Sequence, residues 1–120
     1  MIKLLDVSKV YSRTGAALEE VSLHIPKGSF VFLTGHSGSG KSTTLRIIHM
    51  SESPTSGEVR VSGFSNLRTS RREVWKVRRR VGFVFQDFRL LPGRDALANV
   101  SFALEVTGTA KKEIKPRAQR

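Results

Sequence analysis

Apolar and polar residues alternate along two stretches near the start of the chain, residues 2–7 and 21–25. This alternation predicts half-buried antiparallel strands, because successive side chains of a strand point to opposite faces. Residues 30–33 and 81–85 are apolar at nearly every position, which is typical of strands buried on both faces of a parallel sheet. A further strand is predicted around residues 58–61, after the turn-forming segment Ser53-Pro54-Thr55-Ser56-Gly57.

The spacing of apolar residues predicts helices between and after these strands. In the first helix, Leu45 and Ile48 would share one face, and in the second helix Leu67, Val74 and Val77 would do so. The third helix begins at Asp95, a good N-cap residue, and has Gly108 at its C-cap. The predicted helices span residues 43–48, 66–80, 95–106 and 111–120. Strands and helices in this order predict an α/β fold.

The segment Gly35-His36-Ser37-Gly38-Ser39-Gly40-Lys41-Ser42 matches the phosphate-binding pattern G-x-x-x-x-G-K-[S/T] at every fixed position. Its glycines permit positive φ, so backbone N–H groups can approach phosphate oxygens, and the dipole of the following helix favours an anion. In this pattern Lys41 reaches the β- and γ-phosphates and Ser42 ligates Mg²⁺. A chance Gly/Ser-rich turn is the alternative, which the flanking strand and helix disfavour. The sequence therefore predicts a nucleoside triphosphate site.

Two other residues have both a functional and a structural interpretation. Gln86 ends a predicted core strand, where ligands gather in α/β sheets. Its carboxamide could accept a hydrogen bond from a metal-bound water and donate one to a γ-phosphate oxygen. It could instead form hydrogen bonds only with the backbone of the loop. The sequence favours neither interpretation. Tyr11, at the end of the first strand, could stack on adenine. Completion of a hydrophobic core is the interpretation that the sequence alone favours for Tyr11.

Positive charge is concentrated in the second half of the chain. The net charge is +11, and residues 61–120 hold fourteen Lys and Arg against five Asp and Glu. The arginine clusters at residues 68–72 and 78–80 could bind phosphates of lipid or nucleic acid, although a solvated helix face is more usual. Trp75 lies between them and is expected to pack against the sheet. The absence of cysteine, of a signal peptide and of a long apolar run leads us to expect a cytoplasmic chain.

Four features together resemble the ATPase domain of ABC transporters. They are Tyr11, the phosphate loop through Thr43, the turn Pro54-Thr55-Ser56-Gly57 and the segment Val81-Gly82-Phe83-Val84-Phe85-Gln86. Within that family, His36 and residues 85–92 are most similar to the cell-division ATP-binding proteins of the FtsE type. ATPases of lipoprotein and macrolide export share less of these two stretches. The resemblance implies a P-loop NTPase-type core with an N-terminal antiparallel β subdomain over residues 1–92. Residues 93–120 would begin a helical subdomain.

The resemblance also implies roles for individual positions. Tyr11 would stack on the adenine of ATP. Gln86 would sense the γ-phosphate, contact Mg²⁺ and couple to a membrane subunit that docks near residues 87–100. The residues that would surround the phosphates are Gly35, Ser37, Gly38, Ser39, Gly40, Lys41, Ser42 and Thr43. Lys41 and Gln86 would be the catalytic residues, and Ser42 and Gln86 the metal contacts.

The family's signature sequence, its second acidic motif and its switch histidine are not found among the 120 residues, so they are expected to lie outside them. We therefore expect weak binding of Mg-ATP by these residues and no hydrolysis. The full-length parent is expected to be a homodimeric ATPase that pairs with an FtsX-like membrane subunit at the inner face of the plasma membrane and acts in cell division. The rivals are an exporter ATPase, a P-loop kinase or GTPase, and a basic module for anionic lipid or, less favoured, nucleic acid.

Overall fold

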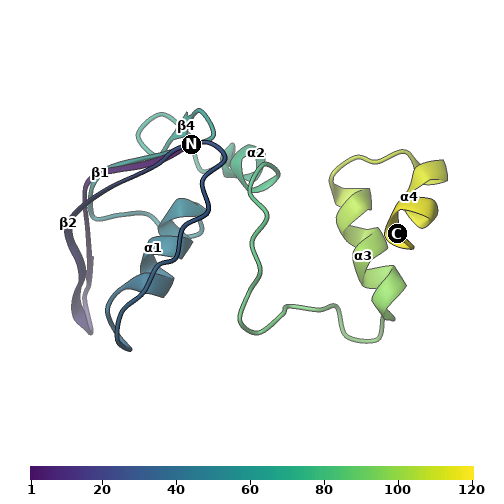
Figure 1. The fold of residues 1–120 in the computed structure, drawn as a ribbon, viewed down its shortest axis with the longest axis horizontal. Coiled ribbons are helices and arrows are strands. Elements are labelled where there is room, and N and C mark those ends of the chain that lie inside the picture. Colours follow the sequence, from purple (N-terminus) through teal and green to yellow (C-terminus); the bar gives the residue numbers. More distant parts are fainter. The chain divides into compact units, whose positions relative to one another are not determined.

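The computed structural model describes residues 1–120, which divide into two compact units, Met1–Gly82 and Phe83–Arg120 (Figure 1). In the first unit, four strands form one antiparallel sheet in the order β2-β1-β3-β4. Their bounds are Ile2–Tyr11 (β1), Gly15–Ile25 (β2), Ser56–Val61 (β3) and Phe64–Ser65 (β4). The predicted strands at residues 2–7, 21–25 and 58–61 are thus confirmed. β2 is longer than predicted, because its pairing with β1 continues back to the Tyr11–Gly15 pair.

Three register shifts interrupt the long ladder between β1 and β2, and two of the bulges contain a residue with positive φ. Asp6 and Glu20 have left-handed backbone conformations, with φ of 47° and 46°. Serine hydroxyls from the opposite strands satisfy both residues. The N–H of Asp6 donates to Ser22 Oγ at 3.0 Å, and the N–H of Glu20 donates to Ser8 Oγ at 2.9 Å. The bulges are therefore hydrogen-bonded parts of the ladder, and they bend it and increase its twist.

The hydrophobic core lies between this sheet and helix α1 (Lys41–Ile48), which runs alongside the strands in Figure 1. The short helix α2 (Val74–Arg78) adds Val77. The largest fully buried side chains are Leu4, Val7, Ile47, Val59, Val61 and Val77. Ile48 is buried as predicted, but the placement of Leu45 on the same face is wrong, since its side chain is 46% exposed. Thr44 and Ile47 face the core instead, because the helix turns that face toward β2 and β3.

The two apolar strands predicted at residues 30–33 and 81–85 do not form, and this prediction is wrong. Neither segment belongs to the sheet, and Phe30 and Val84 are 85% and 90% exposed. A strand that is apolar on both faces is stable only between hydrogen-bonding neighbours with cover on both sides. The four antiparallel strands offer neither segment a partner.

The second helix is much shorter than predicted. Residues 66–68 and 71–73 form turns, and the N–H groups of Arg68 and Thr69 both donate to the carbonyl of Ser65. Leu67 is 70% exposed, so its predicted place on an inner face is wrong. Trp75 is 51% exposed and does not pack fully against the sheet; the guanidinium of Arg79 lies 4.9 Å from its ring centre. Only Val77 anchors this region in the core.

The second unit contains helices α3 (Ala96–Val106) and α4 (Lys111–Ala118), both of which confirm predicted helices. Asp95 is the N-cap of α3, and its carboxylate accepts from the N–H of Ala98 at 2.7 Å. Gly108 follows the C-cap residue Thr107 with φ of 85°, and its N–H donates to the carbonyl of Glu105. None of the helices combines the length and hydropathy that a membrane-spanning segment requires.

The approach of β3 to β1 at Gly57 leads to a test of the sheet. Gly57 and Gly63 both have φ of 87°, but only at Gly57 would a Cβ collide with backbone, at the carbonyl oxygen of Asp6. We expect Gly57→Ala to lower the free energy of unfolding by roughly 3 kcal/mol and Gly63→Ala by roughly 1 kcal/mol, since both incur left-handed strain and one adds a clash. Urea unfolding followed by circular dichroism measures both. Equal losses would show that the two strands are not in close contact.

Candidate nucleotide-binding site

The phosphate loop ends in α1 and leaves the start of that helix open. Gly40 is the N-cap of α1, in a left-handed conformation, and no side chain caps the helix. The first turn contains no acidic residue. Its N–H groups and the positive end of the helix dipole are therefore available to an anion.

Glycine is favoured by a positive φ at both fixed positions of the loop, and at Gly40 it is also required by packing against backbone. A Cβ on Gly40 would lie 2.5 Å from the carbonyl oxygen of Ala17 and 2.7 Å from Cδ2 of Leu18, both in β2. A Cβ on Gly35 would lie 2.6 Å from Ser39 Oγ. At Gly38, with φ of 80°, a Cβ would meet no atom within 4 Å. The loop is thus held against β2 at one end and has open space beside its middle.

The ammonium group of Lys41 is oriented by the loop itself. Its Nζ donates to the carbonyl oxygens of Gly35 at 2.8 Å and His36 at 2.6 Å, and it lies 3.3 Å from Ser39 Oγ. These bonds can use all three N–H donors of the ammonium. An ionised phosphate oxygen forms a stronger, charge-assisted bond than a neutral carbonyl does, so it would compete for these donors. The loop therefore holds a positive charge where phosphates would enter.

The hydroxyl residues after Lys41 have different surroundings. Ser42 is exposed, whereas Thr43 is buried and Thr44 donates to the carbonyl of Gly40 at 3.0 Å. A hydroxyl oxygen suits Mg²⁺, which prefers oxygen ligands and is usually bound together with substrate phosphates. No three His, Cys, Asp or Glu side chains gather in the structure to hold a metal ion. Ser42 fits a Mg²⁺ that shares its ligands with nucleotide phosphates.

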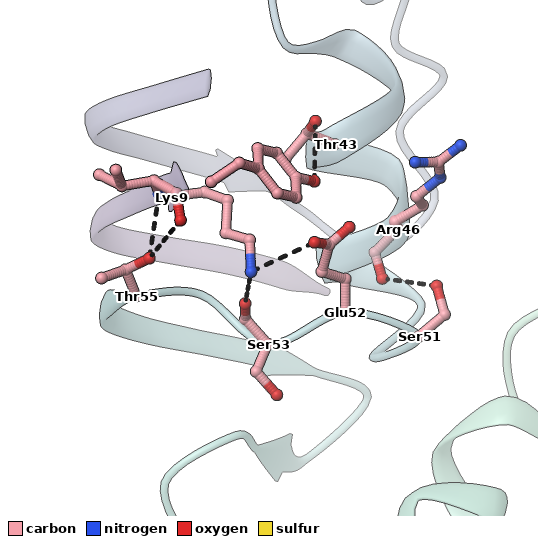
Figure 2. A network of polar contacts seen from close by, with 9 residues as sticks. Lys9, Thr43, Arg46, Ser51, Glu52, Ser53 and Thr55 are labelled. Carbon is pink, nitrogen blue, oxygen red and sulfur yellow. Dashed lines mark hydrogen bonds and ion pairs between the residues drawn. The ribbon is translucent and has the colours of Figure 1, made fainter. Parts of the chain in front are cut away.

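A network of polar contacts joins the end of β1 to α1 and to the residues after it, and Figure 2 labels Lys9, Thr43 and Glu52 within it. The Tyr11 hydroxyl lies 3.5 Å from Thr43 Oγ1, two residues beyond the loop lysine. The ammonium of Lys9 lies 5.0 Å from the centre of the Tyr11 ring, forms an ion pair with Glu52 at 3.2 Å and donates to the carbonyl of Ser53 at 2.8 Å. The end of β1 is therefore fixed both to the start of α1 and to the segment that follows it.

The charge of Glu52 is stabilised within this network. Burial acts to raise the pKa of its carboxyl, but hydrogen bonds from Tyr11 and Lys9 and the positive charges of Lys9 and Arg46 outweigh burial. The net effect is a pKa below the ordinary value. Glu52 therefore remains an anion that holds Lys9 beside the aromatic ring.

Sequence reasoning missed Lys9 and Glu52. Lys9 lies two residues before Tyr11, and strand alternation places such residues on one face, so this signal was present in the sequence. Glu52 carried no comparable signal, because its contact with Lys9 depends on how β1 packs beside the end of α1. The same packing brings Tyr11 to Thr43, 32 residues away.

Gln86 lies in the other unit and is exposed, outside any strand. Its predicted approach to the γ-phosphate and to Mg²⁺ stays a prediction. Of the predicted site residues, the structure brings together Tyr11 and the loop residues 35–43, all within the first unit.

A sheet packed on a helix that starts at a G-x-x-x-x-G-K-S loop defines a P-loop nucleotide-binding protein. Comparison with known families makes the assignment narrower. Residues 18–119 match the sequence profile of the ABC transporter family, and the chain belongs to this family. The resemblance that the sequence motifs carried is thereby confirmed, as is the α/β fold.

Two kinds of curated relative are similar to this chain. The methionine import ATP-binding protein MetN 1 of Salmonella typhimurium is 44% identical over 120 residues, which cover 98% of this chain and 35% of the relative. The cell division ATP-binding protein FtsE of Mycobacterium tuberculosis is 51% identical over 109 residues, which cover 90% of this chain and 47% of the relative. The chain thus spans between a third and a half of these relatives.

A solved structure confirms the fold. The ATP-binding cassette MJ0796, in a dimeric post-hydrolysis state bound to ADP and Pi, superposes with a TM-score of 0.90 at 40% identity. The superposition covers 99% of this chain and 54% of the cassette. The fold is therefore that of the corresponding part of an ABC cassette.

Proposed function

We propose that residues 1–120 form the ATP-binding part of an ABC ATPase subunit, with residues 35–43 around the phosphates and Mg²⁺ at Ser42. The observation that carries this proposal is the Lys41 ammonium, fixed between the carbonyl oxygens of Gly35 and His36 at the uncapped start of α1. The similarity to a cassette solved with ADP and Pi supports it.

In this function, Tyr11 stacks on the adenine and Gln86 senses the γ-phosphate. The contact between the Tyr11 hydroxyl and Thr43 supports the role of Tyr11, since it fixes an aromatic ring beside the first turn of α1. Lys9 and Glu52 hold that ring in place. Mg²⁺, when bound, would neutralise phosphate charge. The chain's own contribution is to orient the phosphates by backbone N–H groups and the ammonium of Lys41.

The biological process is proposed to be cell division, with an FtsX-like membrane subunit that docks near residues 87–100 of an ATPase dimer at the inner face of the plasma membrane. The 51% identity to FtsE over 109 residues supports this choice, and the methionine import ATPase, 44% identical over 120 residues, matches this chain about as well. The exposed side chains of Phe88 and Leu90 in this region give the membrane subunit an apolar surface to contact.

We expect Lys41→Ala to weaken ATP binding by about 1.5–3 kcal/mol, the contribution of a hydrogen bond to a charged group. Isothermal titration of the chain with Mg-ATP measures the change. Lys27→Ala, which removes an exposed lysine from the turn before residue 30, is the matched control and should bind as the unchanged chain does. Unchanged affinity in Lys41→Ala would exclude the loop as the phosphate site.

Lys9→Met should weaken ATP binding roughly 2- to 5-fold, because it removes the cation–π contact between the Lys9 ammonium and the Tyr11 ring. Binding of inorganic tripolyphosphate, which has no base, should not change. Lys3→Met on the same strand is the control. An equal loss for ATP and tripolyphosphate would show that the network supports the loop rather than the base.

The proposed process can be tested with chimaeras in which residues 1–120 replace the matching segment of an FtsE-type or a MetN-type ATPase. We expect the first chimaera to restore division in cells that lack their own FtsE, because residues 87–100 should fit the division subunit. The second should fail to restore methionine import. The reverse pattern would assign this chain to import.

A further inference from the structure

A dense group of exposed basic side chains surrounds α2 in the first unit. We name it the arginine surface, and its members are Arg68, Arg71, Arg72, Lys76, Arg78, Arg79 and Arg80. Glu73 is the one acidic residue within residues 68–80. Nothing in the nucleotide site uses these side chains, since they lie outside residues 9–11, 35–43 and 52.

The fold exposes most side chains around α2 to solvent. Val77 is the only fully buried residue of the five-residue helix α2, and Trp75, Lys76 and Arg78 around it are exposed. Trp75 is half exposed, with the Arg79 guanidinium against its ring. Leu67, just before the arginines, is more exposed still. Large apolar side chains thus lie among the positive charges.

Most of the positive charge has no carboxylate partner within the chain. Glu73 binds Lys76 at 2.9 Å and accepts from Ser70 Oγ at 2.9 Å, and these bonds lower the pKa of its carboxyl. Arg68, Arg71 and Arg72 form no ion pair within 4.0 Å. Arg78 donates to the carbonyl of Met50, and Arg80 lies over the ring of Phe64. The charge of Arg68 also acts on Glu58, whose pKa is lowered mainly by hydrogen bonds from Arg60 and Ser65, but the seven basic residues still leave this surface with a large net positive charge.

We infer that the arginine surface binds the anionic headgroups of a lipid bilayer, with Trp75 entering the interfacial region. Basic side chains near a membrane surface are attracted to anionic lipids, and tryptophan prefers the boundary between headgroups and acyl chains. A lipid surface accounts for Leu67 and Trp75 together. Proteins that bind single-stranded nucleic acid usually add aromatic rings on which bases stack, and residues 66–80 contain only one aromatic residue, Trp75. The surface would give the ATPase a direct membrane contact of its own.

The chain contains a single tryptophan, so its fluorescence reports on this surface directly. We expect the 120-residue chain to co-sediment with vesicles of phosphatidylglycerol and phosphatidylcholine, with a shift of Trp75 emission to shorter wavelength. Vesicles of phosphatidylcholine alone should cause neither effect. Binding should weaken as salt is raised, because the attraction is screened.

Arg68→Gln, Arg71→Gln and Arg72→Gln combined should weaken binding to the anionic vesicles on the order of 100-fold. The matched control removes three positive charges from α4 by Lys111→Gln, Lys112→Gln and Lys115→Gln, and should bind nearly as well as the unchanged chain. Circular dichroism of both variants checks that they are folded.

Three results would overturn the inference. The first is equal binding to vesicles with and without phosphatidylglycerol. The second is an equal loss in the α4 control, which would show that only net charge matters. The third is tighter binding to a single-stranded oligonucleotide than to anionic vesicles, which would assign the surface to nucleic acid.

Discussion

The start of α1 meets β2 at Gly40, where the carbonyl of Ala17 and the side chain of Leu18 leave no room for a Cβ. This contact fixes the end of the phosphate loop to the sheet. The core side chains Ile47 and Ile48 then hold the rest of α1 in place. Because backbone N–H groups act as donors only when the loop keeps one shape, the packing of a glycine against a strand is a precondition for binding phosphate.

The electrostatics of the site follow from the same packing. The uncapped start of α1 and the Lys41 ammonium group lie within a few residues of each other. Loop carbonyls accept hydrogen bonds from this ammonium, and a phosphate oxygen, as a stronger acceptor, can replace them. In the segment after α1, Glu52 remains ionised and keeps Lys9 beside Tyr11. One helix therefore positions both the group proposed for the phosphates and the ring proposed for the base.

The sequence predicted the local features well, because local chemistry determines them. The loop pattern located the start of α1, the Asp95 cap located α3, and alternation located β1 and β2. It failed where structure depends on distant partners. Residues 30–33 and 81–85 have the composition of buried strands, but they find no neighbouring strand in this sheet. Residues 66–73 continue a helical pattern, but the carbonyls of Ser65 and Ser70 accept hydrogen bonds typical of turns, and the helix begins only at Val74.

Amide chemical shifts of the isotope-labelled chain during titration with Mg-ATP test the central claim most directly. If the loop and the start of α1 bind the phosphates, the largest changes will be at the N–H groups of residues 35–43. They will fall sharply in Gly40→Ala, because the added Cβ displaces the loop from β2. Changes that centre on the arginine surface, with residues 35–43 unmoved, would contradict the account.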